Sequence, residues 1–186
     1  MKTLVFLLEE LSAKALLQGL VPRLVGPNVE TRYLVFEGKQ DLEGQLVKRL
    51  RGWQAPDSVF VVLRDQDAAD CRAVKARLAE LVQASGRAAL IRVACRELEA
   101  WVAGDLQALS EAFQLAKVVE HVNKEKFRDP DKLVRPVDSL RALVKDYQKV
   151  DGARRVGPLL DLARNTSASF SAFCGGVRRL VSETVA

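Results

Sequence analysis

The segment Ser58 to Leu63, SVFVVL, constrains the fold more than any other part of the sequence. Its apolar residues are consecutive and rich in β-branched side chains, whereas a strand with one solvated face alternates apolar and polar residues. Such a strand is covered on both faces, as in the middle of a parallel sheet whose crossover helices lie on either side. We therefore expect this segment to be a central strand of a parallel α/β sheet.

Strand and helix patterns alternate along the first two-thirds of the chain, and then the strand patterns stop. Further strands are predicted at residues 2–8, 31–36 and 88–94. Helices are predicted at residues 13–24, 41–50, 68–84 and 98–113, followed by three more at 137–148, 152–163 and 169–182. The alternating order is typical of a parallel sheet. We divide the chain into an α/β domain, residues 1–121, and a basic helical extension, residues 122–186, packed on the same domain.

Positive charge is concentrated in this extension. Residues 1–121 contain 16 Lys or Arg and 16 Asp or Glu, whereas residues 122–186 contain 13 and 8, which accounts for the whole net charge of +5. A basic region beside a neutral body is typical of proteins that bind an anionic partner such as nucleic acid, and ordinary solvation of helical faces is the alternative. The residues considered for phosphate contacts are Lys124, Lys126, Arg128, Lys149, Arg154 and Arg155.

Several classes of protein are disfavoured by the composition. No apolar run approaches the roughly 20 residues of a membrane helix, and the first apolar stretch ends at Glu9 and Glu10 without a cleavage site, unlike a signal peptide. Three widely spaced cysteines fit a reducing cytoplasm rather than a disulfide framework. With His121 as the single histidine, zinc and iron have little to bind. The sequence contains no glycine-rich phosphate loop and no hydrolase triad at motif spacing.

Carboxylates follow three of the predicted strands. They are Glu9 and Glu10 after the first strand, Asp65, Asp67 and then Asp70 after the third, and Glu97 and Glu99 after the fourth. In open parallel sheets, ligands bind at the carboxyl ends of the strands. These acids are therefore expected to meet at one edge of the sheet.

A cluster of carboxylates needs neutralisation, because like charges within about 4–6 Å disfavour joint ionisation. Hard cations such as Mg²⁺ take oxygen ligands and bind through carboxylates together with substrate phosphates. Asp65 and Asp67 point the same way as long as the chain is extended. The sequence thus predicts a Mg²⁺ site, with Mn²⁺ as the alternative metal. The competing interpretation makes Asp67 a simple N-cap for the helix that begins at Ala68.

A strand ending in glutamate and a strand ending in DxD, within this order of elements, resemble the Toprim fold of topoisomerases, primases, recombination mediators and overcoming-lysogenization-defect nucleases. The whole chain resembles domain of unknown function family 4276, a bacterial Toprim-like family. The similar segments, between about residue 34 and residue 173, are FEGKQDLEGQL, VFVVLRDQDAADC, IRVACRELEAWVAGD, KFRDPDKL, DYQKVDGARRV and NTSASFSAF. The resemblance implies a Toprim-like parallel four-stranded sheet flanked by helices, with a C-terminal helical extension.

Two glutamates compete for the place of the Toprim glutamate. FEGKQD, which contains Glu37, looks more like the motif. The Toprim arrangement, however, places two helices and one additional strand between the strand that ends in glutamate and the strand that ends in DxD. Glu9 lies 56 residues before Asp65 with that content, whereas Glu37 lies 28 before it with one helix only. We favour Glu9, with Ser12 in the place of the family's serine and Glu10 where the motif usually has glycine. Glu37 is the alternative; if Glu9 holds the place, Glu37 and Asp41 line a neighbouring strand end or pair with Lys39.

The resemblance also implies a function. Glu9 would transfer protons, Asp65 and Asp67 would hold Mg²⁺, and Glu97 and Glu99 would complete a second metal site or support the first. The protein is then expected to be a Mg²⁺-dependent nuclease acting on phosphodiester bonds of nucleic acid, in defence against phage and other foreign DNA, with an ATPase partner. The main alternative is a non-catalytic Toprim-like module that binds metal or a partner protein and regulates it. A nucleotidyl- or phosphotransferase that uses the same metals is a third interpretation.

Overall fold

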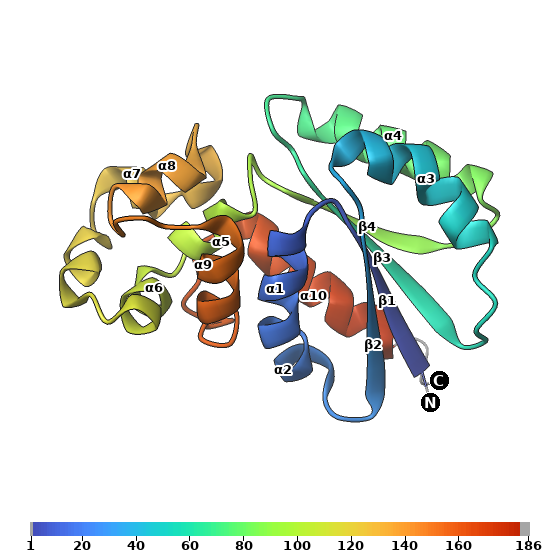
Figure 1. Cartoon of the computed structure of the whole chain (residues 1–186), viewed down its shortest axis with the longest axis horizontal. Coiled ribbons are helices and arrows are strands. Elements are labelled where there is room, and N and C mark those ends of the chain that lie inside the picture. The colour runs from blue at the N-terminus through green and yellow to red at the C-terminus, as the bar shows by residue number, and fades with distance from the viewer. Residues whose placement is uncertain (1, 183–186) are drawn as a thin grey trace.

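The structure, a computed structural model, describes residues 2–182 and places four parallel strands in one sheet (Figure 1). The strands are β1 (Lys2–Leu8), β2 (Val29–Val35), β3 (Ser58–Asp65) and β4 (Ala89–Ala94), in the spatial order β2-β1-β3-β4. As its sequence predicts, β3 is an inner strand, and its residues from Phe60 to Leu63 are at most 4% exposed. The predicted parallel α/β fold is confirmed.

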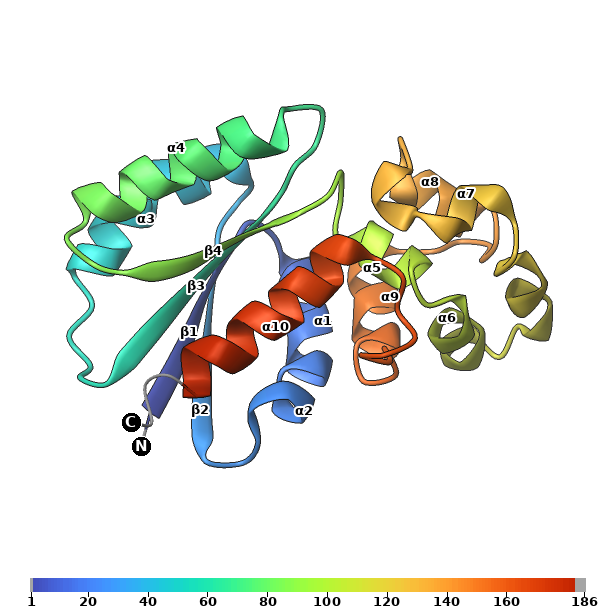
Figure 2. The ribbon, with the colours of Figure 1, turned by 180° about the vertical axis from the view of Figure 1, so that it is seen from behind.

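Each face of the sheet has its own apolar cluster, because successive side chains of a strand point to opposite faces. Phe6 of β1 packs on one face with two helices, and Leu7 packs on the other face with two more. The first pair is α1 (Leu11–Leu20) and α10 (Ala168–Ser182), and the second is α3 (Lys39–Arg51) and α4 (Cys71–Ala84). Figures 1 and 2 show these layers on opposite sides of the sheet.

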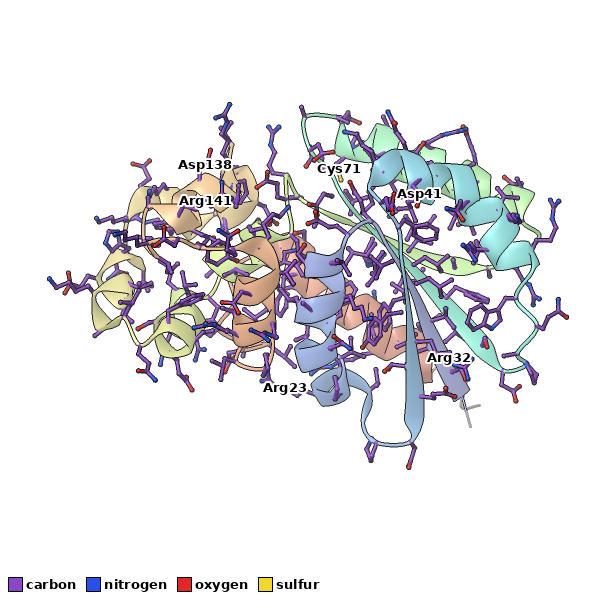
Figure 3. All side chains as sticks on the ribbon, in the orientation of Figure 1. Arg23, Arg32, Asp41, Cys71, Asp138 and Arg141 are labelled. Atoms are coloured by element: carbon purple, nitrogen blue, oxygen red, sulfur yellow. The ribbon has the colours of Figure 1, made fainter. Side chains whose placement is uncertain are left out.

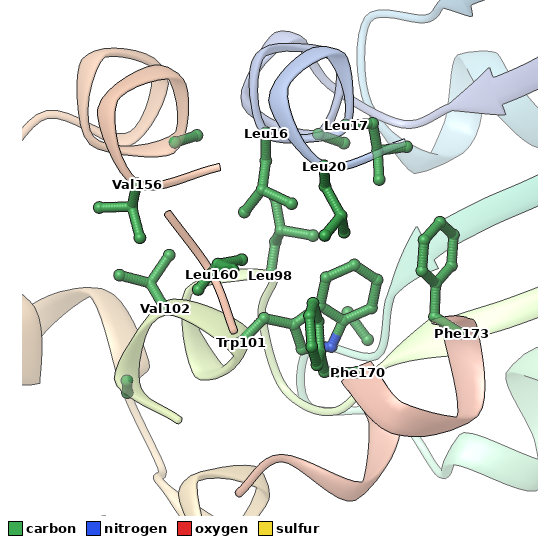
Figure 4. Packing of buried hydrophobic residues seen from close by; sticks show 14 of the residues in the cluster. Leu16, Leu17, Leu20, Leu98, Trp101, Val102, Val156, Leu160, Phe170 and Phe173 are labelled. Carbon is green, nitrogen blue, oxygen red and sulfur yellow. The ribbon is translucent and has the colours of Figure 1, made fainter. Parts of the chain in front are cut away.

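A helical lobe lies beyond the carboxyl ends of the strands (Figure 1). Its elements are α5 (Glu99–Ala103), α6 (Leu106–Phe113), the 3-10 helix η1 (Ala116–His121), α7 (Glu125–Arg128), the 3-10 helix η2 (Pro130–Lys132), α8 (Pro136–Arg141) and α9 (Lys149–Val156). The lobe and one face of the sheet share a continuous core, in which the ring of Trp101 lies 5.7 Å from Phe170 and 5.0 Å from Phe173 (Figure 4). The predicted extension therefore supplies α10, which covers one face of the sheet. The domain boundary at residue 121 stays a prediction.

Breaks within several predicted helices have local causes. The predicted helix at residues 13–24 is interrupted before α2 (Pro22–Val25), because a proline cannot donate the next helical hydrogen bond. The predicted helix at 98–113 breaks where Asp105 accepts a hydrogen bond from the N–H of Ala108 at 3.1 Å and begins α6. There, a side chain in place of Gly104 would come within 2.3 Å of Asn165 Oδ1. The helices predicted at 137–148 and 152–163 end at Arg141 and Val156.

Buried polar contacts fix the segment that leads from the lobe back to α10. The side chain of Asp105 is fully buried and accepts hydrogen bonds from the guanidinium of Arg164 at 2.7 and 2.9 Å. Asp131 accepts hydrogen bonds from the backbone N–H of Ser169 at 2.8 Å and from the hydroxyl of Ser167 at 2.7 Å. KFRDPDKL and NTSASFSAF, two of the segments that carry the family resemblance, thus hold α10 on the sheet.

The two ends of the described chain lie side by side (Figures 1 and 2). Nζ of Lys2, at the start of β1, donates a hydrogen bond to the carbonyl oxygen of Val181 at 2.9 Å. Both ends are therefore at the amino-terminal edge of the sheet, away from the edge where the predicted acids follow the strands.

Replacing Asp105 with asparagine is expected to lower the free energy of unfolding by about 1.5–3 kcal/mol, because the buried carboxylate accepts charge-assisted hydrogen bonds from Arg164 and from the N–H groups of Ala108 and Asp161. Chemical denaturation of the full chain measures this loss. Asp138→Asn is the matched control: Asp138 is 49% exposed and pairs with Arg141 on α8 (Figure 3), and exposed pairs contribute about 0–1 kcal/mol. Equal losses in the two variants would contradict the role assigned to Asp105.

Candidate metal centre at the carboxyl edge of the sheet

The pairing of β1 with β3 brings Glu9 next to Asp65. Oε2 of Glu9 accepts a hydrogen bond from the backbone N–H of Asp65 at 3.0 Å and lies 3.9 Å from Nε of Arg64. Burial raises the pKa of the Glu9 carboxyl above its usual range, the N–H of Asp65 opposes this effect, and the charge of Asp67 adds to it. Glu9 and the DxD segment, far apart in the sequence, therefore meet at one edge.

Asp65 and Glu99 are the most deeply buried acids of this edge, with exposures of 7% and 2%. Burial raises the pKa of Asp65 well above its usual value, and the charges of Glu99 and Glu10 raise it further. Burial also raises the pKa of Glu99, to about 7, although Lys149 opposes this. Two carboxyl groups are thus held where negative charge is unfavourable, which is the condition for binding a cation or a proton.

Lys149, the first residue of α9, is the cation that faces these acids from the helical lobe. Its Nζ lies 2.8 Å from Oε1 of Glu10 and 3.5 Å from Oε2 of Glu99, and within residues 2–182 the latter oxygen makes no hydrogen bond. Burial alone would lower the pKa of Lys149, but the charges of the surrounding carboxylates outweigh it and raise the pKa. Lys149 was considered for phosphate contacts, and the structure places it among the acids.

The segment DYQKVDGARRV places Lys149 through close packing. The buried ring of Tyr147 lies against Gly152, where a Cβ atom would come within 2.3 Å of the ring. Burial raises the pKa of Tyr147, and the charge of Glu99 adds to this effect, so its hydroxyl remains protonated. A residue larger than glycine at position 152 would displace the start of α9 and its lysine.

The loops after β3 and β4 are tied together around Gln66 and Asp67. The N–H of Asp67 donates to the carbonyl of Arg96 at 2.7 Å, and both residues have left-handed backbones, with φ of 56° and 60°. The side chain of Gln66 accepts from the N–H of Arg96 at 3.2 Å and donates to the carbonyl of Ala69 at 2.9 Å. These hydrogen bonds hold the left-handed backbones of Asp67 and Arg96 in place, and backbone conformations of this kind are frequent at functional sites.

The N-cap interpretation of Asp67 is wrong. The cap of α4 is Asp70, whose side chain accepts a hydrogen bond from the N–H of Ala73 at 2.9 Å. The carboxylate of Asp67 instead forms an ion pair with Lys39 at 2.8 Å. Asp70 thus has a structural role, whereas Asp67 pairs with a lysine at the edge of the sheet.

The remaining predicted acids and Ser12 differ in their surroundings. Buried Ser12 donates a short hydrogen bond to the carboxylate of Glu10. Glu97 accepts a hydrogen bond from the N–H of Val137 at 3.1 Å, so it supports the first turn of α8. Glu37 is exposed at the end of β2, which β1 separates from β3. The strand order therefore favours Glu9 over Glu37 as the glutamate beside the DxD segment.

The other basic residues considered for phosphate contacts lie on the helical lobe and are exposed. Lys126 and Arg128 belong to α7, whereas Arg154 and Arg155 both pair with Asp151 within α9. Only Lys149 among these candidates reaches the acidic edge, and no periodic pattern in the sequence marks it. Gln66 and Arg64 were not predicted to have a role there.

The acidic edge fits a hard divalent cation by its chemistry. All its donors are carboxylate oxygens, the ligands that Mg²⁺ prefers, and burial raises the pKa of Asp65 and Glu99, with a smaller contribution from neighbouring carboxylates. Within residues 2–182, however, no three His, Cys, Asp or Glu side chains converge into a ready set of metal ligands. Lys149, Lys39 and Arg64 are the cations that contact these acids. The individual ligands therefore stay a prediction.

The parallel four-stranded sheet with its flanking helices is a Toprim-like α/β fold. The C-terminal region of the Burkholderia pseudomallei OLD protein has the same fold, with a TM-score of 0.54 and 15% sequence identity, over 98% of each chain. At this identity the likeness shows the fold alone. No curated protein matches the sequence.

The chain belongs to the family described as Domain of unknown function (DUF4276), which matches residues 8–178. This match includes the acidic edge, the helical lobe and most of α10. Across residues 2–182, none of the helices combines the length and the apolar composition needed to cross a membrane.

Replacing Glu99 with glutamine is expected to change how stability depends on pH. Because the pKa of Glu99 is raised from 4.5 to about 7, its protonated form favours folding, and this stability is fully present below pH 4.5 and lost as the pH rises through 7. At pH 8, the Glu99→Gln variant should be more stable than the wild type by roughly 1–3 kcal/mol, since one pKa unit corresponds to about 1.4 kcal/mol. At pH 4.5 the two should be nearly equal.

Denaturation with urea at pH 4.5, 6 and 8 in EDTA measures this difference. Glu120→Gln is the control, because it also removes one carboxylate charge but at an exposed position of η1. A Glu99→Gln protein that is less stable than the wild type at pH 8 would show that the ion pair with Lys149 outweighs the cost of burial.

Proposed function

We propose that this chain is a Mg²⁺-dependent nuclease that hydrolyses phosphodiester bonds of nucleic acid, with Mn²⁺ as the alternative metal. The observation that carries the proposal is the position of Glu9, whose carboxylate accepts a hydrogen bond from the N–H of Asp65 at 3.0 Å. A group suited to proton transfer thus lies beside acids suited to a hard cation. Neither group needs a distant segment to move in order to meet the other.

Bound at Asp65 and Asp67, Mg²⁺ would stabilise the charge that develops on a phosphodiester and lower the pKa of a bound water. Glu9 would exchange the proton, because its raised pKa brings the carboxyl closer to neutral pH, where acid–base catalysis is most effective. Lys149, charged and 30% exposed beside Glu10, would contact a phosphate oxygen of the substrate. Gln66 would keep the DxD segment in its conformation.

The biological setting is a further part of this proposal. The fold is shared with the C-terminal region of an OLD protein, and the chain spans nearly all of that region. An ATPase partner is part of the proposal, and the pair would act against phage or other foreign DNA. The exposed basic residues of the lobe, Lys126, Arg128, Arg154 and Arg155, would contact the phosphate backbone and make binding sensitive to salt.

The ion pairs of the acidic edge favour a second candidate function, a non-catalytic module that binds metal or a partner protein. Lys149 and Lys39 already neutralise Glu10 and Asp67. A site of this kind is stable without a metal, and a partner's basic side chain would compete for the same carboxylates. The two functions differ in whether a phosphodiester bond is broken.

Cleavage of supercoiled plasmid separates these candidates. With Mg²⁺ or Mn²⁺, the wild type is expected to nick or linearise the plasmid, EDTA should stop the reaction, and Asp65→Asn should slow it by at least about a hundredfold, because a metal ligand is lost. Asp138→Asn, on the lobe, should cut like the wild type. Absence of cleavage with either metal, alone and with a candidate ATPase, would favour the non-catalytic module.

Metal binding has its own readout, independent of cleavage. A cation that binds only the folded chain stabilises it by about 2.7 kcal/mol at a concentration of about 100 times Kd, so Mg²⁺ should raise the Tm of the wild type by several degrees. The Tm of Asp65→Asn should not respond to Mg²⁺, whereas that of Asp138→Asn should respond fully. A response that is the same in all three proteins would place the bound metal elsewhere.

A further inference from the structure

A cavity of about 580 Å³ opens directly beside the acidic edge. Its lining comes from the β1–α1 turn, the end of β2 and the start of α9, and includes Glu10, Ser12 and Lys149. The volume lies in the range of small-molecule sites, about 300–1,000 Å³. The cavity therefore shares residues with the candidate metal centre but extends away from it, toward β2.

The cavity has an apolar wall that is open to solvent. Leu11, at the start of α1, is 60% exposed, and Val150, the second residue of α9, is 46% exposed. Phe36 and Val35 close the wall at the end of β2. Two segments far apart in the sequence thus present large, exposed apolar side chains in the lining of the same cavity.

Charged groups of opposite sign, from different elements, belong to the lining of the cavity. Lys149, paired with Glu10 and Glu99, lies at the acidic edge, where the metal of the proposed function would hold a phosphate. Glu37 lies at the end of β2, and within residues 2–182 its carboxylate makes no hydrogen bond or ion pair. A ligand that matches this arrangement has an anionic group, a flat apolar part and a hydrogen-bond donor beyond it. A nucleotide with an exocyclic amino group on its base has these three features.

Resting on the proposed function, we infer that the cavity binds an unpaired nucleobase next to the phosphate at the metal centre. Leu11 and Val150 contact the faces of the base, and the carboxylate of Glu37 accepts a hydrogen bond from an exocyclic amino group, which cytosine and adenine have and thymine lacks. A base inside a duplex is stacked and paired and cannot enter the cavity. The protein therefore prefers single strands, frayed ends or extruded nucleotides over intact duplex.

The first test observes the cavity directly and needs no cleavage. Methyl NMR spectra of the full chain are recorded in Ca²⁺ with dCMP, dTMP and inorganic phosphate as separate probes. The expected result is that dCMP shifts the methyl signals of Leu11 and Val150, that dTMP shifts them less, and that phosphate leaves them unchanged. Val134, 79% exposed on the lobe, is the internal control and should not shift. No shift at Leu11 and Val150, or equal shifts at Val134, would overturn the inference.

The second test uses binding of fluorescent oligonucleotides in Ca²⁺. Leu11→Ser combined with Val150→Ser should weaken binding of a single strand roughly fivefold, as expected when one base loses its apolar contacts, and should leave binding of the matching duplex unchanged. Val134→Ser should change neither. Glu37→Gln should reduce the preference for cytosine over thymine. If the double substitution weakens binding of the single strand and of the duplex equally, the two residues belong to a general nucleic-acid-binding surface and not to a site for an unpaired base.

Failure of this inference and failure of the proposed function give different results. A protein that cuts plasmid in Mg²⁺ but shows no methyl shifts with nucleotides is a nuclease without the base site. A protein that shows the specific shifts and cuts nothing binds nucleotides at the cavity, and the nuclease assignment falls instead.

Discussion

The arrangement of the acidic edge depends on the parallel pairing of β1 with β3. In the register that joins Leu8 to Leu63, the residue after β1 reaches the backbone of the residue at the end of β3, so that the N–H of Asp65 holds the carboxylate of Glu9. Every other member of the edge is placed relative to this contact: Glu99 follows β4 as the first residue of α5, and Lys149 begins α9 in the lobe. A strand order with β2 next to β3 would have brought Glu37 to that position instead.

The sequence predicts the sheet well, because its signals are local. Consecutive apolar residues identify β3, and the carboxyl-end rule then selects the acids. The choice of Glu9 over Glu37 depends on the order of the strands. The number of helices and strands predicted between Glu9 and Asp65, compared with the Toprim arrangement, indicated that order. Boundaries were less predictable where a single tertiary contact decides them, as at Gly104, where the side chain of Asn165 leaves no room for a larger residue.

The contribution of the helical lobe could not be read from the sequence in the same way. Lys149 looks like any solvated lysine on a helix, and only the packing of Tyr147 on Gly152 brings it to Glu10. Likewise, Gln66 stands between two aspartates without a pattern of its own, yet its side chain joins two loops. Contacts between residues that are 30 to 140 positions apart leave no periodicity, so the structure is needed to find them.

The hydrogen bond between Lys2 and Val181 has a practical consequence for handling this protein. Residues 2 and 182, the two ends of the described chain, lie at the amino-terminal edge of the sheet. An affinity tag or a surface tether attached at either end would therefore project away from the carboxylates at the opposite edge. The protein can thus be immobilised with its acidic edge facing the solution, accessible to long polymers that a randomly oriented layer would exclude.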